Sequence, residues 1–117
     1  MDNTEELTPS EIIMFRAECY KVGDGGGVFS LYSIKSDVRK IFTEKAFSDN
    51  FKLLTKDSEH AGIKIVSENI KKSLAEVKYI EHFNENGELR TFYSKTFLIK
   101  EADVWRILKE KREIKIG

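Results

Sequence analysis

The second half of this 117-residue sequence alternates between apolar and polar residues with a period of two. The alternation runs through residues 75–83 (AEVKYIEHF) and again through residues 88–100 (ELRTFYSKTFLIK), with Asn86-Gly87 between the two runs. Such alternation is typical of β-strands with one buried face, and Asn-Gly is a strong signal for a tight turn. The sequence therefore predicts an antiparallel hairpin over residues 75–100.

Two further strands are predicted beside this hairpin. Residues 63–70 are rich in Ile and Val, and EAD at residues 101–103 reverses the chain into VWRILKEK. The arm over residues 88–100 would exceed about 40 Å at roughly 3.3 Å per residue, so it must twist, bend or bulge. If the last strand continues through Ile114 and Ile116, its charged residues protect an edge of the sheet from uncontrolled pairing.

The first half is predicted to be helical. Thr8 and Glu11 have the spacing of a capping box, and Pro9 occupies the first helical position. The helix begins at Thr8 or Pro9 and ends near Val22, because Gly23 readily adopts a left-handed cap. Its predicted apolar side consists of Ile12, Ile13, Phe15, Ala17, Cys19 and Tyr20.

The glycine-rich stretch KVGDGGGVFSLY, residues 21–32, invites comparison with phosphate-binding loops. A P-loop ends in Gly-Lys-Ser/Thr, whereas Gly27 is followed by Val28 and Phe29. A dinucleotide-binding loop follows a strand, whereas here a helix precedes it. We therefore interpret the stretch as a turn between helices, with Asp24 capping the second helix.

Shorter helices follow this turn. Residues 28–34 form an apolar segment of one or two helical turns, and Ser36 is positioned to cap the next. A further helix is predicted from Thr43 to residue 54. In it Phe47, Phe51 and Leu54 share one face, which we expect to be buried.

Composition limits the classes of partner and site. Twenty basic residues balance twenty acidic ones, so binding to nucleic acid is not expected. Cys19 is the only cysteine, which excludes an intramolecular disulfide, and we interpret it as a structural residue. We expect a single domain over residues 8–117, preceded by a flexible polar spacer over residues 1–7.

No run approaches the roughly 20 apolar residues of a membrane-spanning helix, and the N-terminus does not read as a signal peptide. Two cellular locations stay open. We slightly favour an extracytoplasmic one, with an export signal removed upstream of the polar spacer, over a cytoplasmic one.

Four segments resemble the nuclear transport factor 2-like superfamily, whose members form a cone of cystatin-like shape. They are GD at 23–24, SDVRKIFTEKAFSDNF at 36–51, AEVKYIEHFNENG at 75–87 and FLIKEADVWRI at 97–107. The resemblance implies an α+β fold in which N-terminal helices pack on a strongly curved antiparallel sheet of about four strands. It also implies a pocket between sheet and helices, which is either open or filled by side chains.

The superfamily contains both binding proteins and enzymes. Many small bacterial relatives are similar to extracytoplasmic accessory domains, and others are isomerases, dehydratases or cyclases. Dimerisation through the open face of the sheet is common among them, so the resemblance also implies a homodimer. On the second hairpin arm, we expect Phe92, Thr96 and Leu98 to contribute to an exposed face of this kind.

One carboxylate is a candidate for acid–base catalysis. Glu81 has the same strand parity as Val77 and Phe83, so it can point into the cone, with Tyr79 or Tyr93 stabilising an oxyanion. The alternative is that Glu81 lies near the exposed end of its strand or that a bulge reverses its direction. We favour this second interpretation.

Other candidate residues belong to a pocket rather than to a reaction centre. Tyr20, Tyr32, Tyr79 and Tyr93, with Trp105, are candidates for the pocket lining, although we favour core packing as their role. His60 in a polar loop and His82 on the opposite parity form no recognisable metal pair, so no metal or other cofactor is expected.

These observations favour a non-catalytic module that binds a small apolar ligand or a protein partner. The alternative is a small isomerase or dehydratase that uses a carboxylate in the cone pocket.

Overall fold

The computed structural model describes the backbone of residues 7–115 and the side chains of residues 7–113. Within the spacer predicted over residues 1–7, only Leu7 is described, and it packs against the core. Ile116, to which the last strand was extended, also lies outside the described residues. The helices are α1 (Pro9–Val22), α2 (Gly25–Ser30), α3 (Asp37–Ile41) and α4 (Glu44–Leu54), and the strands are β1 (Ser58–Lys71), β2 (Leu74–Glu85), β3 (Glu88–Glu101) and β4 (Val104–Lys115).

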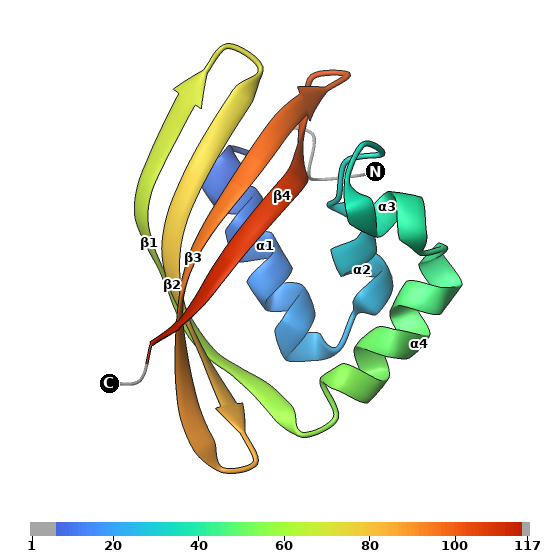
Figure 1. Cartoon of the computed structure of the whole chain (residues 1–117), viewed down its shortest axis with the longest axis vertical. Helices are drawn as coiled ribbons and strands as arrows, with labels where there is room; N and C mark the ends of the chain where they lie inside the picture. The colour runs from blue at the N-terminus through green and yellow to red at the C-terminus, as the bar shows by residue number, and fades with distance from the viewer. Residues whose placement is uncertain (1–6, 116–117) are drawn as a thin grey trace.

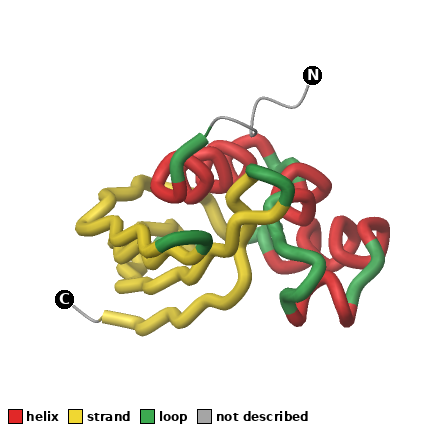
Figure 2. Tube along the Cα trace, turned by 90° about the horizontal axis from the view of Figure 1, so that it is seen from above, coloured by secondary structure: helices red, strands yellow, loops and turns green. Residues whose placement is uncertain are grey.

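The four strands form one antiparallel sheet in the order β1-β2-β3-β4. The sheet is curled but not closed, and α1 lies across its concave face with the other helices beyond it (Figures 1 and 2). The α+β, cystatin-like architecture expected from the sequence is confirmed. Asn86 and Gly87 have φ values of 53° and 83°, which matches the predicted tight turn.

The caps of α1 form as predicted. Thr8 accepts a hydrogen bond from the Glu11 backbone N–H, while the Glu11 carboxylate accepts one from the backbone N–H of Thr8. Gly23 ends the helix with φ 72°. One expected core residue is wrong, because Phe15 is 37% exposed on the side of α1 that faces away from the sheet.

The glycine-rich stretch is a turn between helices. The Asp24 carboxylate accepts a hydrogen bond from the backbone N–H of Gly27 at 2.8 Å and so caps α2. A Cβ atom on Gly25 would lie 3.1 Å from the Phe51 ring, so glycine at this position lets α2 approach α4 closely.

A bulge in β4 changes which of its residues face inward. Phe97 pairs with Lys109 whereas Leu98 pairs with Ile107, so Leu108 is the extra residue. Strand residues alternate between faces, and one inserted residue reverses that alternation. Ile107 faces the core before the bulge, and Glu110 and Arg112 face the same way after it, opposite the buried residues of β3.

The sheet face predicted to be exposed is in fact the buried one. Phe92, Thr96 and Leu98 are 7%, 0% and 0% exposed. The reason lies in the register, since Leu98 and Thr96 pair with Ala75 and Val77, which are also buried. Cross-strand partners share a face, so all of these side chains point toward α1.

Two other expectations require correction. Leu54 is 72% exposed, whereas Phe51 is buried and Phe47 half-buried, because Phe51 packs on the Tyr20 ring and Phe47 on the Phe29 ring, while Leu54 is the last residue of α4. Strand β1 begins at Ser58 rather than at Ile63, because β2 is long enough to pair with the earlier residues. His60 is therefore a strand residue and not a loop residue.

The core fills the space between α1, α2 and the sheet. The buried cluster consists of Ile12, Ile13, Cys19, Val28, Leu31, Tyr32, Phe51, Ala75, Val77, Tyr79, Leu98, Trp105 and Ile107.

None of the described helices is long and apolar enough to cross a membrane.

Candidate ligand pocket at the open end of the cone

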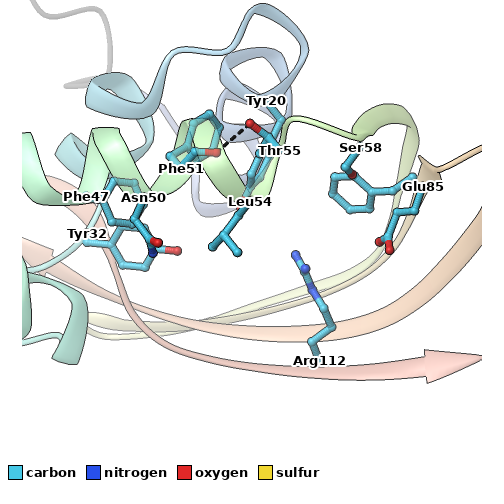
Figure 3. Close-up of a pocket in the computed structure, with 11 residues that line it drawn as sticks. Tyr20, Tyr32, Phe47, Asn50, Phe51, Leu54, Thr55, Ser58, Glu85 and Arg112 are labelled. Carbon is cyan, nitrogen blue, oxygen red and sulfur yellow. Dashed lines mark hydrogen bonds between the residues drawn. The ribbon is translucent and has the colours of Figure 1, made fainter.

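A cavity of about 280 Å³ opens between α4 and the concave face of the sheet (Figure 3). We call it the mouth pocket. Its walls come from helices α1 and α4, from the start of β1 and from the far ends of β2 and β4. It is lined by Tyr20, Tyr32, Phe47, Asn50, Phe51, Leu54, Thr55, Ser58, Phe83, Glu85 and Arg112.

Aromatic rings form the inner wall of the mouth pocket. The Tyr20 ring stacks on Phe51 at 5.4 Å between centroids and meets the Phe83 ring edge-on at 5.7 Å. Phe47 stacks on Phe51 at 6.2 Å. These contacts fix the rings in place and leave part of their apolar surface facing the cavity.

Arg112 brings a positive charge to this wall. Its guanidinium carbon lies 5.5 Å from the centre of the Phe83 ring and 4.9 Å from that of Phe92, within the range of cation–π contacts. Its Nη2 lies 3.5 Å from Glu81 Oε1, and 40% of the Arg112 side chain is exposed. Figure 3 shows the guanidinium end pointing away from β4, toward Leu54.

Glu81 lies behind this arginine and is fully buried. Its side chain is 0% exposed, as is that of His60, whose Nε2 lies 3.0 Å from Glu81 Oε2. The interpretation that we favoured, with Glu81 at an exposed strand end, is wrong, because β1 starts early enough to bring His60 over it.

A second charged cluster lies deeper in the cone. Arg16 of α1 is fully buried and forms an ion pair with Glu110. Its Nη2 donates to the Tyr79 hydroxyl at 2.6 Å and its Nη1 to the Tyr32 hydroxyl at 3.3 Å. The Tyr79 hydroxyl also lies 2.8 Å from the Thr96 hydroxyl. These contacts compensate much of the cost of burying the guanidinium.

The pKa values of this cluster follow from burial and pairing. Burial alone would lower the pKa of Arg16, but Glu110 and the neighbouring phenol oxygens outweigh it and raise that pKa well above its usual value. Burial would raise the pKa of Glu110, but the charge of Arg16 and hydrogen bonds from Tyr32 and Arg16 hold it below its ordinary value. Burial raises the pKa of Tyr32 well above its usual range. Both members of the Arg16–Glu110 pair are therefore charged at neutral pH.

The structure distributes the predicted pocket residues over three places. Tyr20 and Tyr32 line the mouth pocket, and Tyr79 belongs to the Arg16 cluster. Tyr93 is 40% exposed on the outer face of the sheet, and Trp105 is buried in the core with its ring near Lys100. The two predicted oxyanion partners lie elsewhere: the Tyr79 hydroxyl binds Arg16 and Thr96, and Tyr93 lies on the opposite parity of its strand, on the outer face of the sheet.

Four important residues were not recognised in the sequence. Arg16 follows Ile12 and Ile13 by four and three residues, so its place on the apolar side of the helix was a usable signal. The sequence predicts His60 in a loop because the strand is expected to begin only at Ile63, whereas it begins at Ser58. Glu110 and Arg112 depend on the β4 bulge, which has no clear sequence signal.

Comparisons with known proteins identify the fold. No protein-family model matches this sequence, and no curated protein matches it either. A domain of unknown function with a cystatin-like fold from Nostoc punctiforme superposes with a TM-score of 0.77 at 13% identity, covering 100% of this chain and 81% of the other.

Two further solved structures carry functional descriptions of their own. A protein from Streptomyces avermitilis, designated a dehydratase of the nuclear transport factor 2-like family, has a TM-score of 0.65 at 11% identity and covers 92% and 94% of the two chains. An association domain of calcium/calmodulin-dependent kinase II type from Exiguobacterium sibiricum has a TM-score of 0.67 at 12% identity, with 100% and 98% covered. At these identities the likeness concerns the fold, which is that of the cystatin-like, nuclear transport factor 2-like proteins.

Proposed function

We propose that this chain is a non-catalytic binding module that holds a small, largely apolar ligand in the mouth pocket. The observation that carries the proposal is the open cavity of about 280 Å³ with a wall of aromatic rings. This volume is near the lower end of the usual range for small-molecule sites, about 300–1,000 Å³, so the ligand is small.

The contacts of Glu81 support a binding role over a catalytic one. A proton carrier must come within hydrogen-bond reach of its substrate. Both Glu81 oxygens already have partners, His60 and Arg112, and the side chain is 0% exposed. In this arrangement the carboxylate acts on the pocket through Arg112, which it helps to position.

The alternative function is a proton-transfer enzyme of isomerase or dehydratase type. It is favoured by the burial of an acidic residue next to an imidazole, a pairing common in acid–base catalysis, and by the dehydratase designation of one structural neighbour. The Glu81→Gln variant separates the two functions. Under the binding proposal it still binds ligand, whereas an enzyme would lose deuterium exchange at the α-carbon of a small ketone, followed by NMR.

Thermal shift with 4-phenylbutan-1-ol, a neutral aromatic probe, tests the binding proposal directly, because a ligand selective for the native state raises its melting temperature. Leu54→Asp, in the pocket wall, should reduce the shift severalfold. Leu53→Asp is the matched control: Leu53 is 74% exposed, close to the 72% of Leu54, but does not line the cavity. Equal shifts for both variants would contradict the proposal.

A protein partner is proposed for the outer face of the sheet, where a second copy of the chain is the first candidate. The outer face presents Tyr93 and Phe97, but Lys78, Lys95 and Lys111 are direct cross-strand partners in its middle. Two copies meeting there bring like charges together, so the dimer should be weak and should strengthen with salt. Sedimentation at low and high ionic strength tests this.

An extracytoplasmic location stays a prediction, which fractionation of the native cells tests.

A further inference from the structure

We infer that the ligand of the mouth pocket carries a single carboxylate group and that Arg112 binds it. This inference rests on the proposed function and specifies the chemical class of the ligand: a small aromatic or short-chain carboxylic acid.

Arg112 has unused hydrogen-bonding capacity. A guanidinium has five N–H donors in a fixed fork that matches a carboxylate. Among the described residues, only Glu81 is bonded to Arg112, through one nitrogen at 3.5 Å. The remaining donors belong to a side chain that is 40% exposed and lines the cavity.

The guanidinium of Arg112 is already held in place. It lies over the rings of Phe83 and Phe92, which restrict it from the sheet side. Glu81, itself fixed by His60, holds one edge of the fork. A ligand therefore does not have to order this long side chain, which reduces the entropic cost of binding.

The carboxylates around Arg112 limit the negative charge that a ligand can carry. Glu85 lines the cavity, and Glu81 and Glu110 lie behind it, each with a cationic partner: Arg90 at 4.0 Å for Glu85, Arg112 for Glu81 and Arg16 for Glu110. A monoanion on Arg112 meets one well-placed cation among these carboxylates. A dianion such as phosphate would meet stronger repulsion from the same three groups.

The mouth pocket has a charged end and an apolar end. Opposite the charged end, the cavity is walled by Tyr20, Phe51 and the exposed Leu54. A ligand with an acid group at one end and a ring or short chain at the other satisfies both parts. Purely polar acids leave the aromatic wall uncovered.

The test is isothermal titration of the full chain at pH 7 with three probes: 4-phenylbutyrate, its neutral counterpart 4-phenylbutan-1-ol, and 2-phenylethyl phosphate. We expect the carboxylate to bind roughly tenfold tighter than the alcohol, the effect of about one hydrogen bond between charged groups. The phosphate should bind more weakly than the carboxylate.

Variants then locate the recognition. Arg112→Gln should reduce the affinity for 4-phenylbutyrate to that for the alcohol, and Arg112→Lys, which keeps the charge without the fork, should recover part of it. The matched control is Lys111→Gln, which removes a positive charge one residue away on the other face of β4 and should leave the preference unchanged. Thermal unfolding of each variant confirms that it is folded.

The possible outcomes separate this inference from the proposed function. If the alcohol binds as tightly as the carboxylate, or if the preference survives in Arg112→Gln, the carboxylate inference is wrong while the binding function stands. A phosphate that binds tighter than the carboxylate would overturn the single-charge requirement. If none of the three probes binds at millimolar concentration, both the inference and the proposed function fail.

Discussion

Two arginines on the concave side of the sheet, Arg16 and Arg112, differ in almost every physical respect. Arg16 is fully buried, with an ion pair and two phenol hydroxyls around it. Arg112 is partly exposed and lies at the mouth pocket, where the long contact with Glu81 is the one hydrogen bond of its guanidinium among the described residues. A buried cation with compensating partners supports the fold, whereas a fixed cation with spare donors at a cavity is available to a ligand.

The largest expected effect breaks the deeper cluster. Arg16→Met leaves Glu110 without its cation and the Tyr79 and Tyr32 hydroxyls without their donor. Removing one partner of a buried pair typically costs about 3–5 kcal/mol, so we expect the free energy of unfolding in urea to fall by that amount. Arg112→Met should cost only about 1 kcal/mol, because Arg112 is 40% exposed and Glu81 keeps its hydrogen bond with His60. Equal losses for the two variants would remove the distinction between the clusters.

A smaller effect is expected when only one hydrogen bond of the deeper cluster is deleted. Tyr79→Phe removes the hydroxyl that accepts from Arg16 and meets Thr96, which should cost about 1–3 kcal/mol because buried polar groups lose a partner. Tyr20→Phe is the matched control, since the Tyr20 hydroxyl has no hydrogen bond among the described contacts. Its unfolding free energy should change by less than about 0.5 kcal/mol.

The pH dependence of stability sharpens the comparison further. Burial would raise the folded-state pKa of Glu110, but the charge of Arg16 and the hydrogen bond from Tyr32 hold it below the ordinary value of 4.5. A carboxylate with a lowered folded-state pKa contributes stability above its unfolded value and loses that contribution as the pH falls through the folded one. Between pH 5 and pH 3, the free energy of unfolding should therefore decline less steeply in Glu110→Gln than in the wild type. Equally steep declines in the two proteins would show that the Arg16–Glu110 pair does not contribute to this pH dependence of stability.

The smallest expected effect on stability accompanies a large effect on binding. Leu54→Asp and Leu53→Asp both change exposed residues, so each should alter the free energy of unfolding by about 0.5 kcal/mol or less. Only the first should weaken probe binding. If urea unfolding showed a large loss of stability in Leu54→Asp alone, its weaker probe binding would reflect unfolding and not the chemistry of the pocket.

The expected fold could be predicted because its signals are local. The capping box at Thr8 and Glu11, the αL cap at Gly23 and the Asn86-Gly87 turn each depend on a few neighbouring residues, and all three were confirmed. The burial of Val77, Tyr79 and Phe83 followed from their alternation in one strand.

The candidate site was only partly predictable, because its members are brought together by register. Tyr20 and Tyr32 were assigned to the pocket lining and do line it. The sequence predicts only that the charged residues of the last strand, Arg112 among them, protect an edge of the sheet. A simple alternation from Trp105 would place Arg112 on the outer face. Leu108 reverses that alternation by one residue.

By itself, the sequence determined that helices with capped ends would precede a four-stranded antiparallel meander, because caps, turns and periodicity act over a few residues. Only the tertiary structure decided that Glu81 would be covered by His60 and that Arg112 would face the mouth pocket. Those positions depend on where β1 starts and on one bulge in β4, and both result from pairing between strands distant in the chain.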